Sequence, residues 1–242
     1  MLKRRLFLLL AVLLPLLGFA QAKSVPYFSQ IGGTSKLDAD WTVYNVNGDE
    51  KTWINDASSS SNYSSITAVK VTAGAKYVYN TKADANDWLV SPAIHLEADK
   101  EYKVSFYVKT SGSFKESLRL AVANANTADA MATKSETLLD FPELTEKTFV
   151  KKSVVYVARE SGDYYFGLYE YSKKDLYNVF VTAFSVAENI TTPAPVTGLT
   201  ATEGANEAIT VDLKWTLPTK DEDGKDLTTP LTGVEVYRDG TL

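Results

Sequence analysis

Apolar and polar residues alternate one by one along several short segments of this chain. Residues 102–109 place Tyr, Val, Phe and Val at even positions and Lys, Ser, Tyr and Lys at odd positions. Residues 118–122 repeat the alternation after the turn residues Ser111-Gly112-Ser113. A period of two sends successive side chains to opposite faces of a strand, so each segment predicts a β-strand with one buried face.

Residues 86–94, Asn-Asp-Trp-Leu-Val-Ser-Pro-Ala-Ile, combine a buried strand with an interruption. Pro92 has no amide hydrogen to donate to a ladder. We therefore expect the strand to close at Ser91-Pro92 and to restart at residues 93–96. Residues 25–188 contain other short β-rich segments and no helical period, which favours an all-β, jelly-roll-like sandwich over an α/β fold.

The later part of this first domain carries three weaker signals. Residues 121–139 are rich in Ala, Asn and Thr and predict a long surface excursion that can hold a helical turn. Residues 148–158 and 163–171 predict two strands, joined as a hairpin at residues 159–162. Residues 177–188 predict the last strand of a domain that we place at residues 23–189.

A polar segment with two prolines, residues 190–195, predicts a stiff linker between two domains. Beyond it, residues 199–202, 209–216 and 234–237 predict three strands, and Asp239-Gly240 is a hairpin turn signal. Three strands leave long unpaired edges and little apolar surface to bury. We therefore expect residues 196–242 to be the first part of a larger β-sandwich.

Residues 1–22 have the three-part layout of a secretory signal peptide. Three basic residues precede an apolar run over residues 6–19, and small residues follow it. This run is shorter than the roughly 20 residues that span a bilayer. We expect an exported mature chain beginning near Lys23, without membrane insertion, that crosses the periplasm to the cell surface or the extracellular space.

The net charge restricts the kinds of partner, and the cysteine content restricts what can stabilise the fold. The chain has 25 Lys and Arg against 30 Asp and Glu, and removing three basic leader residues leaves 22 against 30, a net charge of −8. This balance disfavours nucleic acid and anionic membrane surfaces. An exported chain without cysteine has no disulfides, so its fold must rest on core burial or on a metal.

The sequence contains few residues in patterns that are typical of catalysis. The single imidazole, His95, lies in a predicted strand, and no cysteine exists to act as a nucleophile. No Gly-rich phosphate loop and no Cys/His metal cluster occurs in the sequence. Two carboxylates that meet only in space stay possible as a catalytic pair. We expect a noncatalytic protein.

Asn45, Asn47 and Asp49 place three side-chain oxygens on alternate residues, and Gly48 permits a tight turn between them. Ca²⁺ binds several such oxygens, so this loop is a candidate structural calcium site. The alternative is an Asx-rich turn, in which the same side chains satisfy backbone groups without a metal.

Tyr165, Tyr169 and Tyr171 share one face of a predicted strand whose other face holds Tyr164, Phe166 and Leu168. Tyr107 occupies the polar face of the strand at residues 102–109. A tyrosine offers a flat apolar ring with a polar tip, so these four tyrosines are candidates for binding a glycan or a protein. The alternative is that they cover the core or pack beneath a loop.

Two motifs resemble the cleaved-adhesin, or choice-of-anchor J, family of jelly-roll-like modules in Bacteroidetes surface proteins and gingipain-type adhesins. Trp41 and Trp53 bracket the loop of residues 45–49, and residues 86–94 form the second motif. The resemblance implies aspartates in that loop, an acid in the opening strand and acids in the last strand. This chain instead has Asn45, Asn47 and residues 27–30 and 180–184 without acids, which implies loss of any ion bound in relatives.

From Pro193 onward the chain resembles the first half of a fibronectin type III module. Residues 195–199 resemble its opening strand, residues 211–215 its core-tryptophan strand, and residues 234–240 its third strand and turn. The two resemblances together imply an exported, noncatalytic, multi-domain binding or spacer protein.

Three functions follow as hypotheses. The first is an adhesin-like module that binds a glycan or a host or matrix protein through loops or a tyrosine-lined face. The second is the noncatalytic front part of a larger secreted peptidase or glycoside hydrolase. The third is a spacer without a ligand.

Overall fold

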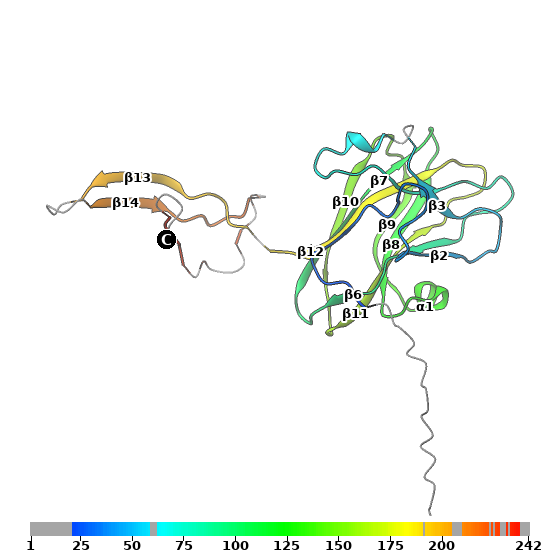
Figure 1. The fold of residues 1–242 in the computed structure, drawn as a ribbon, viewed down its shortest axis with the longest axis horizontal. Coiled ribbons are helices and arrows are strands. Elements are labelled where there is room, and N and C mark those ends of the chain that lie inside the picture. Colours follow the sequence, from blue (N-terminus) through cyan, green and yellow to red (C-terminus); the bar gives the residue numbers. More distant parts are fainter. Residues whose placement is uncertain are drawn as a thin grey trace, which may run out of the picture. The chain divides into compact units, whose positions relative to one another are not determined.

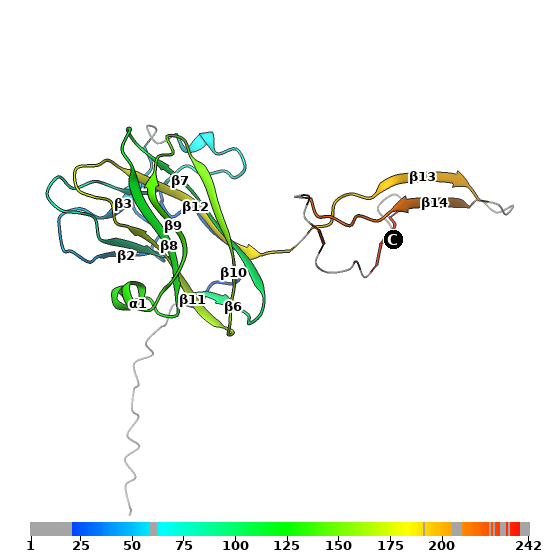
Figure 2. The ribbon, with the colours of Figure 1, turned by 180° about the vertical axis from the view of Figure 1, so that it is seen from behind.

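The computed structural model describes residues 21–58, 62–190, 192–204, 210–222, 224, 226–227, 231 and 233–237. The chain divides into two compact units, Met1–Glu188 and Asn189–Leu242. In the first unit, two antiparallel sheets lie face to face, as Figures 1 and 2 show from opposite sides. The predicted all-β sandwich is therefore confirmed.

The first sheet has the order β10-β7-β12-β4-β3, with β1 added to β12. Its strands are β10 (Val150–Val157), β7 (Glu101–Thr110), β12 (Val179–Glu188), β4 (Gly74–Tyr77), β3 (Trp53–Asp56) and β1 (Tyr27–Ser29). The second sheet has the order β2-β5-β11-β8-β9, with β6 added to β11. Its strands are β2 (Thr42–Asn45), β5 (Asp87–Val90), β11 (Gly162–Glu170), β8 (Glu116–Ala123), β9 (Glu136–Leu144) and β6 (Ile94–Leu96).

The core lies between the sheets, where the alternation of the sequence predicts it. Val104 and Phe106 of β7 and Leu120 of β8 are fully buried, and so are Phe166 and Leu168 of β11. Each such side chain contributes about 1.5–3 kcal/mol of transfer free energy relative to an exposed one. The odd-numbered residues of β7 point to the outer face of the first sheet.

The predicted break between β5 and β6 is confirmed. The backbone of Ser91 pairs with β11 through a hydrogen bond from its amide to the Phe166 carbonyl, 2.9 Å long. Its buried hydroxyl accepts a hydrogen bond from the Phe166 amide (3.0 Å) and donates one to the Pro92 carbonyl (2.9 Å). The Ser91 side chain thus satisfies a donor of β11 at the point where the proline interrupts the ladder.

The prediction of a surface excursion over residues 121–139 is wrong in its extent. β8 continues to Ala123, a short helix α1 (Ala128–Thr133) follows, and β9 already begins at Glu136. β9 escaped prediction because its register shifts against β8 between Leu120 and Ala121, which breaks a simple alternation.

The predicted hairpin at residues 159–162 is also wrong. β10 pairs with β7 in the first sheet, whereas β11 pairs with β8, β5 and β6 in the second sheet. The short connection therefore crosses from one sheet to the other. A turn signal shows that the chain reverses, and long-range pairing decides which neighbours the strands take.

The second unit contains an antiparallel pair, β13 (Thr197–Glu203) and β14 (Val211–Thr216). The strand predicted at residues 234–237 is wrong, because the described residues 233–237 carry no strand. Asp239-Gly240 lies outside the described residues, as does the predicted signal peptide apart from Gln21 and Ala22. None of the helices in the described part of the chain has the length and apolar composition needed to cross a membrane.

Candidate functional site

One row of side chains crosses the outer face of the second sheet from strand to strand. Register pairs Tyr44 of β2 with Trp88 of β5, Trp88 with Tyr169 of β11, Tyr169 with Arg119 of β8, and Arg119 with Asp140 of β9. Residues directly opposite in antiparallel strands share a face, so all five project outward together. We call these five residues and Tyr171 the aromatic face.

The rings of the aromatic face stack on one another. The Trp88 and Tyr169 ring centroids are 4.5 Å apart with an interplanar angle of 22°, and those of Tyr169 and Tyr171 are 5.5 Å apart at 13°. The Arg119 guanidinium lies 5.2 Å from the Tyr171 centroid and 5.9 Å from that of Tyr169. Trp88 is buried beneath this layer, whereas the three tyrosines are partly exposed.

Hydrogen bonds hold the three hydroxyl groups of the aromatic face in place. Tyr44 donates to the Asn126 carbonyl (2.8 Å), and Tyr169 donates to Asn86 Oδ1 (3.0 Å). Tyr171 donates to Asp140 Oδ1 (2.5 Å), and Asp140 also accepts from Arg119 at 3.3 Å. Burial and the nearby Asp140 carboxylate raise the pKa of Tyr171 to about 12, so its hydroxyl stays protonated at neutral pH.

A glycine and a short helix make the floor of this layer. A Cβ added to Gly167 would lie 2.8 Å from the Trp88 ring and 2.9 Å from Met131 Cε. Glycine thus lets Trp88 lie flat on β11 while Met131 of α1 packs beside it. The Thr127 hydroxyl caps α1 by accepting from the Ala130 amide (3.1 Å).

The structure brings together three of the four predicted tyrosines. Tyr165, Tyr169 and Tyr171 lie on the outer face, and Tyr164, Phe166 and Leu168 are buried on the other, as the alternation predicts. Tyr107 lies apart from them, on the outer face of the first sheet, where it packs near Tyr63 and Phe149.

Sequence reasoning missed Tyr44, Arg119 and Asp140 as members of this face. Trp88 stands in the motif of residues 86–94, and its neighbour Leu89 faces the core. The sequence therefore held one signal for the outward residues, the alternation of inward and outward side chains along β5 and β8. The pairing of β2 and β9 with these strands depends on long-range register and gave no such signal.

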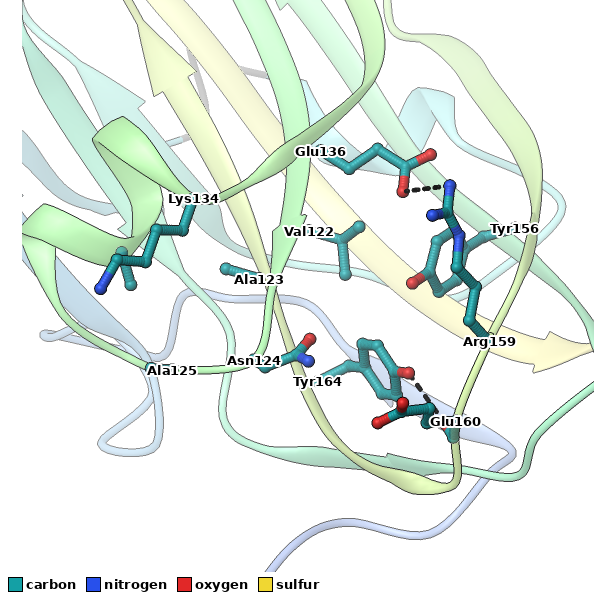
Figure 3. Close-up of a pocket in the computed structure, with 11 residues that line it drawn as sticks. Val122, Ala123, Asn124, Ala125, Lys134, Glu136, Tyr156, Arg159, Glu160 and Tyr164 are labelled. Carbon is teal, nitrogen blue, oxygen red and sulfur yellow. Dashed lines mark hydrogen bonds and ion pairs between the residues drawn. The ribbon is translucent and has the colours of Figure 1, made fainter.

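A pocket lies on the other side of α1 from the aromatic face, at the end of the sandwich. Its volume is about 460 Å³, and it is bounded by the end of β8, α1, the start of β9, and the connection between β10 and β11. Figure 3 shows Glu136 and Arg159 beside Tyr156, Glu160 beside Tyr164, and Lys134 on the opposite side. Tyr164 donates to the Glu160 carbonyl (2.8 Å), and Arg159 lies 4.0 Å from Glu136.

Two neighbouring hollows share residues with this pocket. One contains Asn124, Glu160 and Tyr164 together with His95, and the other contains Glu136, Tyr156 and Arg159. The three hollows therefore follow one another around the β10–β11 connection. His95 is exposed and its Nδ1 lies 2.9 Å from Asp163 Oδ1, which makes it a surface residue at the rim.

The loop predicted to bind calcium is closed by its own hydrogen bonds. Asn45 Nδ2 donates to the Asp49 and Lys51 carbonyls (2.6 and 3.1 Å), and Asn47 Nδ2 donates to Asp49 Oδ2 (3.0 Å). Asp49 also accepts from the Lys51 amide (2.7 Å) and from Asn80 Nδ2 (2.9 Å). Amide nitrogens, which cannot coordinate a cation, therefore point at the centre of the loop.

This geometry does not fit a calcium ion shared by Asn45, Asn47 and Asp49. Asn45 Oδ1, on the opposite side of the amide group from Nδ2, is buried and has no hydrogen-bond partner within the described residues. A shared ion would require both amides to rotate and to give up their hydrogen bonds. Within the described part of the chain, no three acidic, His or Cys side chains form a group that could hold a metal. The arrangement favours the Asx-turn alternative.

Two carboxyl groups lie opposite each other in the interior, on the face of the second sheet that points away from the aromatic face. Asp87 and Glu170 are register partners and both are fully buried. Burial raises the pKa of Glu170 to about 8 and that of Asp87 to about 6. Ser172 donates to Glu170 through its amide (3.1 Å) and through its hydroxyl.

Comparison with known proteins gives one family and a set of related folds. Residues 29–183 match the Cleaved Adhesin Domain family. The K1 Cleaved Adhesin domain of Lys-gingipain from Porphyromonas gingivalis W83 superposes with a TM-score of 0.51 and 14% identity, covering 68% of this chain and 99% of that one. The K2 Cleaved Adhesin Domain of Lys-gingipain gives a TM-score of 0.51 and 13% identity, covering 67% and 98%. No curated protein matches the chain.

At these identities the solved structures show the fold alone. The family match confirms the cleaved-adhesin part of the resemblance seen in residues 41–53 and 86–94. Membership of choice-of-anchor J and the fibronectin type III character of residues 193–242 stay predictions.

Proposed function

The chain belongs to the Cleaved Adhesin Domain family, and we propose that its first unit is a noncatalytic module that binds a glycan. The ligand lies on the aromatic face, against Tyr169 and Tyr171. The module works outside the cell, at the cell surface or in the surrounding medium. The second unit, resembling a fibronectin type III module, serves as a spacer.

The observation that supports this proposal is the row that joins aromatic rings to an Arg–Asp pair on one outer face. A sugar ring has apolar C–H patches and hydroxyl groups, and it needs both kinds of partner. Tyr169 and Tyr171 offer partly exposed rings, while Arg119 and Asp140 offer a charged donor and a charged acceptor at their edge.

The fixed geometry of the face supports affinity. Ring stacking and the hydrogen bonds to Asn86, Asn126 and Asp140 hold the tyrosines before any ligand arrives. A surface that is already ordered loses little side-chain entropy on binding, and about 0.5–1.5 kcal/mol is saved for each side chain that is not newly immobilised.

The test measures glycan binding by the intact mature protein on a glycan array, followed by calorimetry on the strongest ligand. We expect Tyr171→Ala to weaken binding at least tenfold. Tyr177→Ala is the matched control, because Tyr177 is an exposed tyrosine outside the aromatic face. Equal affinities of wild type and Tyr171→Ala, or a flat array, would count against the proposal.

The pocket at the end of the sandwich is a second candidate location for the same class of ligand. It is concave and places Asn124 and Arg159 near the two tyrosine rings. The double variant Asn124→Ala/Arg159→Ala separates the two locations. If it abolishes binding while Tyr171→Ala does not, the pocket holds the glycan and the aromatic face does not.

The alternative that this chain is an accessory part of a larger secreted peptidase or glycoside hydrolase keeps the same binding site. It differs in predicting an enzyme domain in the same gene product. Mass measurement of the protein secreted by its natural host distinguishes the two, because an accessory part would be released with a catalytic domain attached.

A further inference from the structure

The outer face of the first sheet has a chemistry of its own. Four lysines project from it, two on β7, one on β10 and one on β4, and aromatic side chains lie among them. We call these residues the lysine face: Lys76, Lys103, Lys109, Lys151, Phe28 and Tyr107. Their inward neighbours on β7, such as Val104 and Val108, are fully buried, which identifies the lysine side as the outer one.

Strand register puts these residues in rows across the sheet. In one row Lys109 of β7 and Lys76 of β4 flank Phe180 of β12. Their ammonium groups lie 5.0 and 5.8 Å from the Phe180 ring centroid, and Lys109 also lies 5.3 Å from the Phe149 centroid. Cation–π contacts at these distances hold the two charges over the sheet.

A row of small hydroxyl residues follows. Ser153, Ser105 and Ser185 are paired in register, and the Ser105 and Ser185 hydroxyls are 2.9 Å apart. Phe28 of β1 ends this row and is 48% exposed. Lys151 pairs with Tyr107 on one side of the serines, and Lys103 follows on the other. The short serine side chains therefore lie between longer lysine and aromatic side chains on this face.

The charge of this face is opposite to that of the chain. The strands place two carboxylates on it within the described residues, Asp56 and Glu101, against four lysines. Asp56 is only 5% exposed, accepts a hydrogen bond from the Tyr63 hydroxyl (3.0 Å), and has its Oδ1 3.7 Å from Lys76 Nζ, so it pairs with one of the four lysines. None of the ion pairs among the described residues involves Lys103 or Lys151. The chain as a whole has a net charge of −5.

We propose that the lysine face binds an anionic polysaccharide, whose carboxylate or sulfate groups meet the lysines and whose sugar rings lie over the serine row between Phe28 and Tyr107. Lys103 and Lys109 are six residues apart on one strand, about 20 Å, which spans several sugar units. This surface lies on the opposite sheet from the aromatic face and goes beyond the glycan binding proposed there.

A polysaccharide fits this face better than a nucleic acid does. Its hydroxyls match the serines, its C–H patches match the rings of Phe28 and Tyr107, and its charges are spaced one or two to a sugar unit. Duplex DNA carries about one charge per 1.7 Å of its axis, which is a denser spacing than this face with four lysines matches.

The test measures binding of the intact mature protein to heparin, which is sulfated, to polygalacturonate, which carries carboxylates, and to the neutral polymer xylan, at low and at high salt. We expect binding to heparin, to polygalacturonate or to both, with an affinity that falls at least tenfold between 50 mM and 500 mM NaCl. Which polymer binds identifies the anionic group.

Two matched variants locate the site. Lys103→Gln/Lys151→Gln removes two exposed charges and is expected to weaken binding to the anionic polymer at least tenfold. Lys82→Gln/Lys174→Gln removes two exposed charges away from this face and is expected to leave binding unchanged. Tyr171→Ala is expected to retain this binding, which separates the present proposal from the one above.

Three results would overturn the proposal. The first is the absence of binding to both anionic polymers at low salt. The second is an equal loss of affinity in the two double lysine variants. The third is equally tight binding of duplex DNA or of phosphatidylserine vesicles through Lys103 and Lys151. The last result would make the face a general polyanion surface.

Discussion

Ser91 shows how one side chain can replace a backbone group. Pro92 ends the β5 ladder, and the Ser91 hydroxyl accepts the Phe166 amide hydrogen that would otherwise lack a partner in a buried region. A buried donor without an acceptor costs about 1–3 kcal/mol.

We expect Ser91→Ala to lower the free energy of unfolding by about 1–3 kcal/mol, because the Phe166 amide then lacks its acceptor. Urea unfolding followed by tryptophan fluorescence measures the change. Ser153→Ala, on the exposed side of β10, is the control and should stay within about 0.5 kcal/mol of wild type. A change in Ser91→Ala no larger than in the control would refute the role of the hydroxyl.

Glu170 gives the fold a dependence on pH. Its pKa is raised from 4.5 to about 8, because burial favours the neutral form in the folded state. The stabilisation that this difference contributes is complete below pH 4.5 and is lost as pH rises toward 8. The raised pKa of Asp87 acts in the same direction.

We expect the stability of the wild type to fall as pH rises from 4.5 to 8, with a contribution from Glu170 of up to about 1.4 kcal/mol per pH unit. Glu170→Gln should flatten this dependence, since the amide does not ionise. Urea midpoints at several pH values measure it, with the exposed Glu143→Gln as control. Parallel pH profiles for wild type and Glu170→Gln would show that Glu170 ionises normally.

At the level of elements, α1 separates the aromatic face from the pocket. Its six residues are too few to form a helix alone, so packing must hold it. Met131 is 1% exposed and packs against the cluster of Trp88, Val90 and Ala121, while Ala130 lines the pocket. One short helix therefore bounds both candidate surfaces.

We expect Met131→Ala to lower the free energy of unfolding by about 2–5 kcal/mol, because it leaves a cavity over Gly167 and Trp88. It should also weaken ligand binding at the aromatic face, since Trp88 loses a neighbour. Thr133→Ala at the exposed C-terminal end of α1, outside the pocket, is the control. Unfolding and glycan affinity are measured on the same preparations, and unchanged affinity would show that α1 does not shape the face.

For the whole molecule, the two outer faces of the sandwich offer two chemistries, stacked aromatic rings on the second sheet and lysines on the first. A bound metal ion would act on a different property, the stability of the folded unit. An ion that binds only the folded state raises the melting temperature by linkage.

We expect the melting temperature of the mature protein to be the same in 5 mM CaCl₂ and in 5 mM EDTA. The reason is that Asn45 and Asn47 direct amide nitrogens, not oxygens, into the loop with Asp49. Differential scanning calorimetry measures it. An increase of several degrees in calcium would mean that this loop rearranges or that the ion binds elsewhere, and Asp49→Asn would distinguish the two.

Local patterns in the amino-acid sequence were enough to predict the local properties of this protein. Alternation along residues 102–109 and 162–170 set which side chains of β7 and β11 face the core, and Ser91-Pro92 set where β5 ends. The family could be identified from residues 41–53 and 86–94, because motifs are contiguous in the chain. These features depend on neighbouring residues alone.

Which strands are neighbours followed from the three-dimensional structure and from no local pattern. In that structure β10 and β11 lie in different sheets despite the short turn between them, and Tyr107 lies on a different sheet from the other predicted tyrosines. The structure also joined Tyr44, Trp88, Tyr169, Arg119 and Asp140 into one row from five strands. Register between distant strands comes from the packing of the whole core, so no local pattern encodes it, and both proposed binding surfaces depend on it.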